Sequence, residues 1–200
     1  MKTTHVQILD RYNNTLKTYI IKVIKSYVFV NLGAGLLFGI FRSLMINSLN
    51  GFIDGLFFGT MLASIGIPII ILLDIFQKLK CYFKYKIVSY QTNQKIKLLF
   101  EDDYISIFNK LNELLNNNPK IDVYRKDIKI GIIEAISKRS WKSFGEIIKI
   151  EFFDKSNGKV VAVLSSKPRI FWTMIDYCKN FENVEMIMSD INKLFKGAVS

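Results

Sequence analysis

Hydrophobic residues concentrate in two long runs in the N-terminal half of the chain. Residues 26–46 contain a single charged residue, Arg42, and residues 55–73 contain none. As α-helices these runs would be about 31 Å and about 28 Å long, which is enough to cross the hydrocarbon core of a bilayer. Core helices of soluble proteins seldom continue so far without a charge. The pattern therefore predicts a transmembrane hairpin within residues 26–74.

The basic residues predict the orientation of this hairpin. Residues 1–25 carry five Lys or Arg and residues 74–100 carry six, whereas the link at 47–52 carries none. Because basic residues favour the cytoplasmic side, both termini are expected in the cytoplasm of a multi-pass protein of the cell membrane, with the lipid bilayer as a partner. The Ile-, Lys- and Asn-rich composition favours a bacterial source.

The net charge of +11 changes little in this picture. Residues 101–200 contain sixteen basic and fourteen acidic residues, so the excess flanks the apolar runs. A nucleic-acid-binding domain would concentrate its Lys and Arg on the folded part. No nucleic acid is therefore expected as a partner.

Small residues recur at four-residue spacing on both predicted spans, which places them on one face of each helix. They allow close backbone packing either within the hairpin or against another membrane protein or a second copy of the chain. Near the turn, Arg42 and Asp54 lie at similar depth and form a candidate ion pair, although both could instead extend to the headgroups. The glycines of these faces are Gly35, Gly39, Gly51, Gly55 and Gly59.

The segments beside the hairpin show weaker patterns. Apolar residues at helical spacing over 6–27 predict an amphipathic helix within residues 1–25, which lies either on the membrane surface or against the C-terminal domain. Residues 75–100 alternate basic and aromatic side chains at their start, which is typical of a juxtamembrane linker at the headgroup level.

Residues 101–200 are long enough to form a domain with its own core. Helical spacing over 103–117 ends at Asn-Asn-Asn-Pro, and a second helix covers 184–195. Between them lie four strand-like runs, at 121–125, 128–137, 146–153 and 159–166. The order α-β-β-β-β-α predicts an α+β domain with an antiparallel sheet covered on one face by helices.

One stretch near the C-terminus carries a possible signature. Its matching positions resemble a bacterial and plant domain family without an assigned activity, whose signature reads S-x-S-R, then D-x-G-x-N, then a hydrophobic residue followed by Glu. Pro168, Cys178 and Asn183 depart from that signature. The resemblance implies the α-β-β-β-β-α order but no activity. The matching positions are Ser166, Arg169, Asp176, Asn180, Val184 and Glu185.

Asp176 and Asn180 admit two interpretations. They could form a site, or they could turn the chain and cap the last helix, as their residue types favour. Two nearby loops combine hydroxyl groups with basic residues and are candidates for binding an anion or a lipid headgroup. The alternative is a pair of solvated loops and a core tryptophan. The candidate residues in these loops are Lys138, Arg139, Trp141, Ser166, Lys167 and Arg169.

The sequence does not indicate an enzyme. His5 is the only histidine and stands near the start of the sequence, which excludes Ser-His and Cys-His arrangements from the predicted domain. Cys81 and Cys178 are far apart and lack the spacing of metal ligands, so no metal or cofactor is expected.

These observations favour a membrane-anchored protein that displays a cytoplasmic binding, adaptor or regulatory module. The alternative is a subunit of an oligomeric transport or pore assembly packed through the small-residue faces. An enzyme acting on lipid headgroups would have to depend on Asp176 or Arg169.

Overall fold

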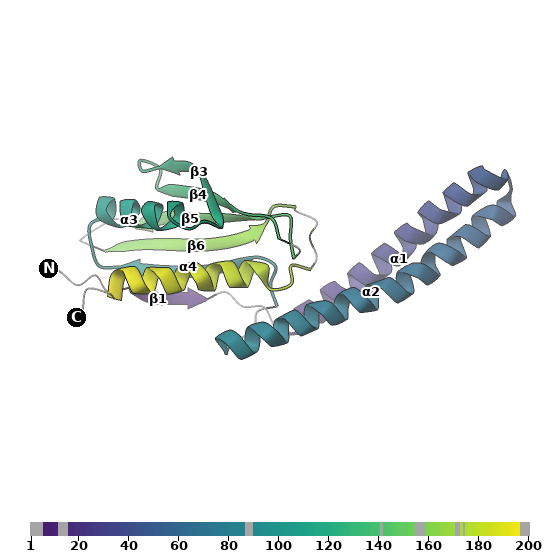
Figure 1. Ribbon diagram of the computed structural model, residues 1–200, viewed down its shortest axis with the longest axis horizontal. Coiled ribbons are helices and arrows are strands. Elements are labelled where there is room, and N and C mark those ends of the chain that lie inside the picture. The colour runs from purple at the N-terminus through teal and green to yellow at the C-terminus, as the bar shows by residue number, and fades with distance from the viewer. Residues whose placement is uncertain are drawn as a thin grey trace. The chain divides into compact units, whose positions relative to one another are not determined.

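A computed structural model describes residues 6–11, 16–86, 90–140, 142–154, 159–170, 173 and 175–196 of the 200-residue chain. The chain forms two compact units. One, called the folded domain below, takes Met1–Asn13 together with Gln91–Ser200, and the other, the helical hairpin, takes Asn14–Tyr90. Figure 1 labels the helices and strands of both units.

The helical hairpin consists of α1 (Leu16–Ile46) and α2 (Leu49–Tyr85). Asn47 makes the turn with a left-handed backbone, at φ 50°. Ser48 then caps α2, its hydroxyl oxygen accepting a hydrogen bond from the Asn50 amide at 3.2 Å. By length and composition, both helices are long and apolar enough to cross a membrane.

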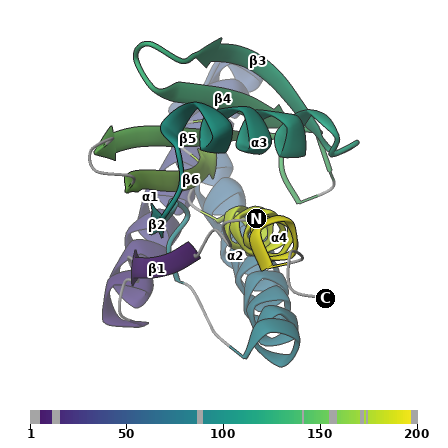
Figure 2. The ribbon, with the colours of Figure 1, turned by 90° about the vertical axis from the view of Figure 1, so that its left-hand side faces the viewer.

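The folded domain is built on a six-stranded sheet in the order β1-β2-β6-β5-β4-β3, with every neighbouring pair antiparallel. The helices α3 (Tyr104–Asn116) and α4 (Lys179–Lys196) lie on the same face of the sheet (Figure 2). The strands are β1 (Val6–Arg11), β2 (Gln94–Phe100), β3 (Ile121–Asp127), β4 (Ile132–Ser137), β5 (Glu146–Asp154) and β6 (Val160–Pro168).

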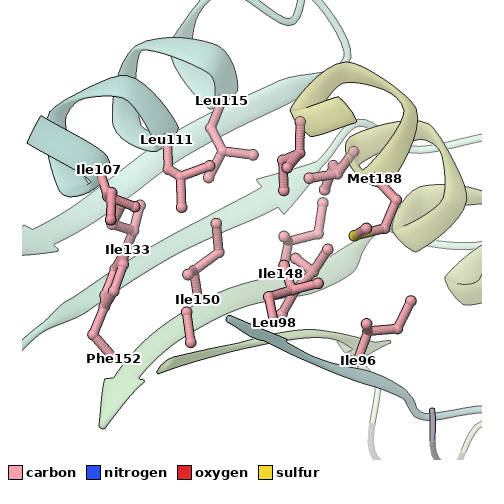
Figure 3. Packing of buried hydrophobic residues seen from close by; sticks show 14 of the residues in the cluster. Ile96, Leu98, Ile107, Leu111, Leu115, Ile133, Ile148, Ile150, Phe152 and Met188 are labelled. Atoms are coloured by element: carbon pink, nitrogen blue, oxygen red, sulfur yellow. The ribbon is translucent and has the colours of Figure 1, made fainter. Parts of the chain in front are cut away.

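Alternating side chains form the core between the sheet and its two helices. In β2 the buried apolar residues are Ile96, Leu98 and Phe100, and the central strands repeat this period of two. Leu111 of α3 and Met188 of α4 point onto this face of the sheet (Figure 3). Asp103 starts α3 by accepting a hydrogen bond from the Ser106 amide at 3.0 Å. The α+β class predicted from the sequence is confirmed.

The sheet nevertheless has six strands rather than the predicted four. Residues 6–11 form strand β1, not the start of an amphipathic helix, and α1 begins only at Leu16. The linker predicted over 75–100 is also wrong, because α2 continues to Tyr85 and β2 occupies Gln94–Phe100. Strands β1 and β2 are short, and hydrogen bonds to partner strands distant in the sequence decide their structure.

The predicted strand at 128–137 is shortened by a turn. The Asp127 carboxylate accepts hydrogen bonds from the amides of Lys129 and Ile130, both at 3.0 Å, and Gly131 has a φ of 83°. The chain therefore reverses between β3 and β4, and Ile128 and Ile130 are exposed turn residues. The predicted hairpin after Asp154 corresponds to the antiparallel pair β5 and β6, although residues 155–158 lie outside the described residues.

The face of the sheet away from the helices carries an ion-pair cluster. Lys149 Nζ lies 2.7 Å from Glu151 Oε1 and 3.7 Å from Glu134 Oε1. The hydrogen bond to Glu151 is the main cause that raises the pKa of Lys149, with burial opposing it. The pKa of Tyr124 is also raised, first by burial and then by the charge of Glu134.

This cluster predicts a loss of stability at alkaline pH. Because the folded pKa of Lys149 exceeds its unfolded value of about 10.5, its contribution is complete below that pH and disappears as the pH rises through the folded pKa. Denaturant unfolding of the full chain in detergent between pH 9 and 12 should show a steeper decline in wild type than in Lys149→Met. Tyr124 acts in the same direction in both proteins. Parallel pH profiles would contradict the prediction.

Candidate functional site

A row of polar side chains ends the hydrophobic core at one end of the sheet. Four buried polar residues lie there: Gln94 and Glu146 begin strands β2 and β5, and Ser137 and Ser166 are the last buried residues of β4 and β6. We call these four residues the polar row. Gln94 lies directly opposite Ser166 in the register. The sequence places them here because each continues the alternation of apolar residues along its strand.

Hydrogen bonds connect the polar row to α4. Ser166 Oγ donates to Asn180 Oδ1 at 2.7 Å, and Asn183 Nδ2 donates to Glu146 Oε2 at 3.1 Å. The Ser137 hydroxyl also donates to Glu146 Oε2. Asn183 Nδ2 lies 3.5 Å from Ser166 Oγ and links the two groups. Three strands and the first turns of α4 are therefore joined by buried polar contacts.

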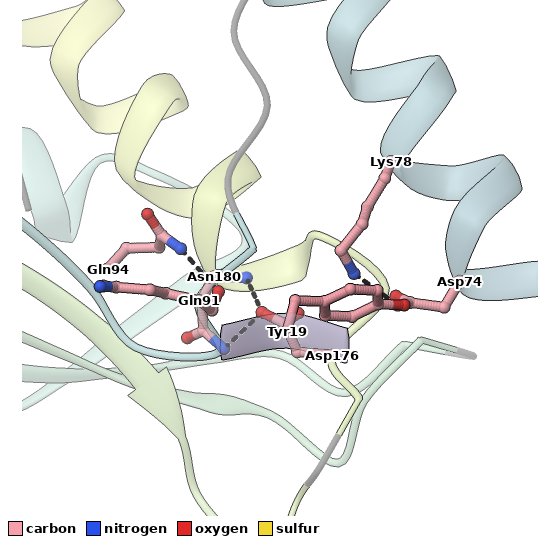
Figure 4. Close-up of polar contacts among 7 residues, drawn as sticks. All are labelled: Tyr19, Asp74, Lys78, Gln91, Gln94, Asp176 and Asn180. Carbon is pink, nitrogen blue, oxygen red and sulfur yellow. Dashed lines mark hydrogen bonds and ion pairs between the residues drawn. The ribbon is translucent and has the colours of Figure 1, made fainter. Parts of the chain in front are cut away.

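Asp176 extends this network from the loop before α4. Its Oδ2 accepts hydrogen bonds from the backbone amide of Asn180 at 3.2 Å and from Asn180 Nδ2 at 3.0 Å (Figure 4). Figure 4 also shows Gln94 Nε2 donating to the Gln91 carbonyl, at 2.6 Å. Asp176 thus caps the start of α4 and orients Asn180 toward Ser166. The capping interpretation and the site interpretation of Asp176 and Asn180 are compatible in this geometry.

Glu146 has one carboxylate oxygen without a hydrogen bond among the described residues. Its side chain is fully buried, and Oε1 has no hydrogen-bond partner among the residues that the structure describes. Leaving a buried acceptor unpaired costs about 1–3 kcal/mol. Gly145 positions it with a φ of 101°, where an added Cβ would lie 2.9 Å from the Ser137 carbonyl oxygen. An external hydrogen-bond donor could remove this cost.

A cavity of about 370 Å³ adjoins this network. Glu146, Asp176 and Asn180 all line it, and so does Lys142, whose ammonium donates to Glu182 Oε1 at 2.6 Å. The size is that of a pocket for a small molecule. Its remaining lining is mixed and includes the apolar or aromatic side chains of Phe144, Pro168, Ile170, Ile175 and Tyr177.

Two consecutive residues of the loop before α4 have a left-handed backbone. Cys178 stands where the signature has glycine, and its φ of 62° lies in the left-handed region that glycine adopts most easily. Tyr177 precedes it with a φ of 47°. The two halves of the signature are brought together, since Ser166 and Asp176 both contact Asn180.

The predicted anion site is only partly assembled. Lys138, Arg139, Lys167 and Arg169 are exposed and follow or end strands β4 and β6 at the end of the sheet that carries the polar row. We call these four residues the basic group. Ser166 is not part of it and that prediction is wrong, because strand alternation turns its hydroxyl into the core. Trp141 lies outside the described residues.

In the helical hairpin, the predicted glycines lie against the opposite helix. A Cβ on Gly55 would meet the Phe38 carbonyl oxygen at 2.3 Å, and one on Gly59 would meet that of Ala34 at 2.5 Å. Gly35, Gly39 and Gly51 have comparable backbone or side-chain neighbours across the hairpin. Arg42 and Asp54 approach to 3.6 Å, with both side chains about half exposed.

Sequence reasoning missed two polar groups. Asp74 Oδ2 accepts hydrogen bonds from Tyr19 Oη and Lys78 Nζ, both at 2.5 Å, which joins α1 to α2 (Figure 4). The i,i+4 spacing of Asp74 and Lys78 was visible in the sequence. Glu146 and Asn183 were also missed, although Glu146 stands in phase with the apolar residues of β5.

In the described part of the chain, no group of three or more His, Cys, Asp or Glu side chains could hold a metal ion. Neither a protein-family model nor a curated protein matches the sequence. The buried network and its cavity provide hydrogen-bond acceptors and shape, which suit binding.

Proposed function

We propose that this protein is a membrane-anchored binding module of the cell membrane. The helical hairpin spans the bilayer, both termini lie in the cytoplasm, and the folded domain binds a ligand or partner there as an adaptor or regulatory element. The end of the sheet with the polar row and the basic group is its binding end.

The observation that carries the proposal is the exposure of large apolar side chains along the helical hairpin. Water-exposed apolar patches of this extent are costly and mark contact with lipid or another protein. The folded domain has a core built from its own residues. Examples, with the exposed fraction of each residue, are Phe29 (70%), Leu37 (71%), Leu44 (78%), Phe57 (69%) and Leu72 (66%).

Chain connectivity supports the hairpin topology. Strand β1 precedes α1, strand β2 follows α2, and the two strands pair, with Val6 opposite Phe100. The start of α1 and the end of α2 therefore both lead into one sheet. Because that sheet lies on one side of the bilayer, the chain between β1 and β2 must cross the membrane an even number of times. The basic flanks and the link without Lys or Arg favour the cytoplasm for that sheet.

The basic group would supply the anion-binding part of this end. Its four side chains are exposed, so they can reach a phosphate or carboxylate without the cost of burying a charge. The partner could be a lipid headgroup or an acidic segment of another membrane protein. A quadruple change of Lys138, Arg139, Lys167 and Arg169 to Gln is expected to reduce the acidic lipid or protein that copurifies in mild detergent.

The topology is tested by cysteine labelling of the protein in sealed inverted membrane vesicles, using a membrane-impermeant maleimide. Lys120→Cys lies in the folded domain and should be labelled, whereas Ser48→Cys in the link should react only after detergent is added. Wild type provides the background for Cys81 and Cys178. Recovery of the protein in the soluble fraction after carbonate extraction, or equal labelling of both positions, would refute membrane anchoring in this form.

The second hypothesis is a transport or pore subunit, and it is based on the small-residue faces of α1 and α2. Within one chain, Gly35, Gly39, Gly51, Gly55 and Gly59 already pack across the hairpin. These five positions are therefore not free to form contacts between subunits. This packing favours the anchored module over the pore subunit as the leading proposal.

A further inference from the structure

We propose that the cavity beside Glu146 is a binding site for a small organic cation that carries N–H donors, such as an alkylammonium or guanidinium group. This inference rests on the proposed function and deepens it, because it names the class of ligand held at the binding end of the folded domain.

Hydrogen-bond capacity is the first support. Glu146 is completely buried, its Oε2 is occupied by Ser137 and Asn183, and its Oε1 has no partner in the part of the chain that the structure describes. A buried acceptor in an otherwise connected network requires a donor. Ammonium and guanidinium groups bring only donors, so each matches this oxygen.

The charge of the lining is the second support. Glu146 and Asp176 are the acidic residues of the lining, and Lys142 is its basic residue. The Lys142 ammonium lies 2.6 Å from Glu182 Oε1, so its charge is compensated from outside the lining. The lining therefore carries more acidic than basic side chains, and a positive ligand would complement the buried Glu146 carboxylate.

The shape of the cavity limits the ligand. About 370 Å³ accommodates an alkyl chain of a few carbons with a charged end group. Phe144, Ile170 and Tyr177 provide apolar surface for the chain of such a ligand. None of the four residues of the basic group lines this cavity, so the cation site and the anion-binding surface are distinct parts of one end of the domain.

The fixed positions of the acceptors favour this site over a solvated gap. Glu146 is held by Ser137 of β4 and Asn183 of α4, and Asp176 is held by two hydrogen bonds from Asn180. A neighbouring strand and α4 thus fix the Glu146 carboxyl group, and the first turn of α4 fixes that of Asp176, before any ligand arrives. Such preorganisation reduces the ordering cost of binding.

The test is a ligand-observed NMR titration of agmatine, which has a guanidinium and an ammonium group on a four-carbon chain, against the full-length protein in a neutral detergent. The neutral diol 1,5-pentanediol serves as a probe of similar length. Agmatine should bind saturably and the diol should not. Glu146→Gln should weaken agmatine binding at least tenfold, because it removes the charge but retains an acceptor for Ser137 and Asn183.

Glu151→Gln is the matched control, since it makes the same change on the same strand outside the cavity lining and should stay within twofold of wild type. If Glu146→Gln fails to fold by circular dichroism, Asp176→Asn takes its place, with the same expected loss. Absence of saturable agmatine binding, equal binding of the diol, or undiminished binding by the folded cavity variant would overturn the proposal.

These outcomes are independent of membrane anchoring, because the titration is performed in detergent. If agmatine does not bind but the cysteine labelling shows the expected topology, the cation site is refuted and the membrane-anchored module still stands. Saturable agmatine binding by a protein that carbonate extracts from the membrane would support the cation site and refute membrane anchoring.

Discussion

Replacing Gly55 by leucine is expected to separate α1 from α2 and to lower the free energy of unfolding of the helical hairpin by at least about 2 kcal/mol. A Cβ at this position would lie 2.3 Å from the Phe38 carbonyl oxygen and 2.9 Å from the Gly39 Cα. Both neighbours are backbone atoms, so no side-chain rotation can make room. Unfolding of the full chain by SDS in mixed micelles measures the loss.

Gly66→Leu is the control for this prediction. It makes the same substitution in the same helix, but a Cβ on Gly66 has nothing within 4 Å. Because leucine is the better helix former, this variant should be neutral or more stable by up to about 1 kcal/mol. Equal destabilisation by the two variants would show that leucine acts through the helix or the detergent rather than through the contact between α1 and α2.

Replacing Asn180 by alanine is expected to destabilise the folded domain by about 2–3 kcal/mol. The change removes the acceptor of the Ser166 hydroxyl and a donor to Asp176 Oδ2, and both of these groups are buried. Denaturant unfolding of the full chain followed by tryptophan fluorescence measures the effect, because both tryptophans belong to this part of the sequence.

Asn116→Ala provides the comparison for Asn180→Ala. Asn116 is exposed near the end of α3, where its side chain donates to the Asn112 carbonyl oxygen at 2.8 Å. Its loss should change the free energy of unfolding by no more than about 0.5 kcal/mol. If Asn180→Ala were as mild as this control, the buried network would not be a stabilising element and its residues would be free to vary.

The candidate site illustrates what local sequence could and could not predict. Asp176 and Asn180 were selected because they match the signature, and their residue types also suited a capped turn. In the structure, Asp176 accepts hydrogen bonds from the backbone amide and the side chain of Asn180 at the start of α4. Glu146 was part of a predicted strand, but its partner Asn183 lies 37 positions later. A contact of this kind depends on where α4 lies across the sheet, and no local pattern encodes that position.

For the basic group, composition selected the residues but could not tell on which face of the sheet each side chain lies. Lys138, Arg139, Lys167 and Arg169 were selected by composition, and antiparallel pairing of β4 and β6 with β5 brings them to one end of the sheet. Ser166 was selected with them by the same criterion. Its alternation with Lys167 along β6 puts the two side chains on opposite faces, which only the register of the sheet decides.

The sequence by itself determined the two long apolar helices, the α+β class and the helical and strand periodicities of the folded domain. These properties depend on runs of apolar residues or on repeats within about ten to twenty positions, so neighbouring residues in the sequence are enough to determine them. The tertiary structure alone decided that residues 6–11 form a strand, that β1 pairs with β2, which follows the helical hairpin in the sequence, and that the Glu146 side chain contacts Asn183 of α4. The six residues of β1 are too few to favour one periodicity, so hydrogen bonds to a strand more than eighty positions away determine their conformation.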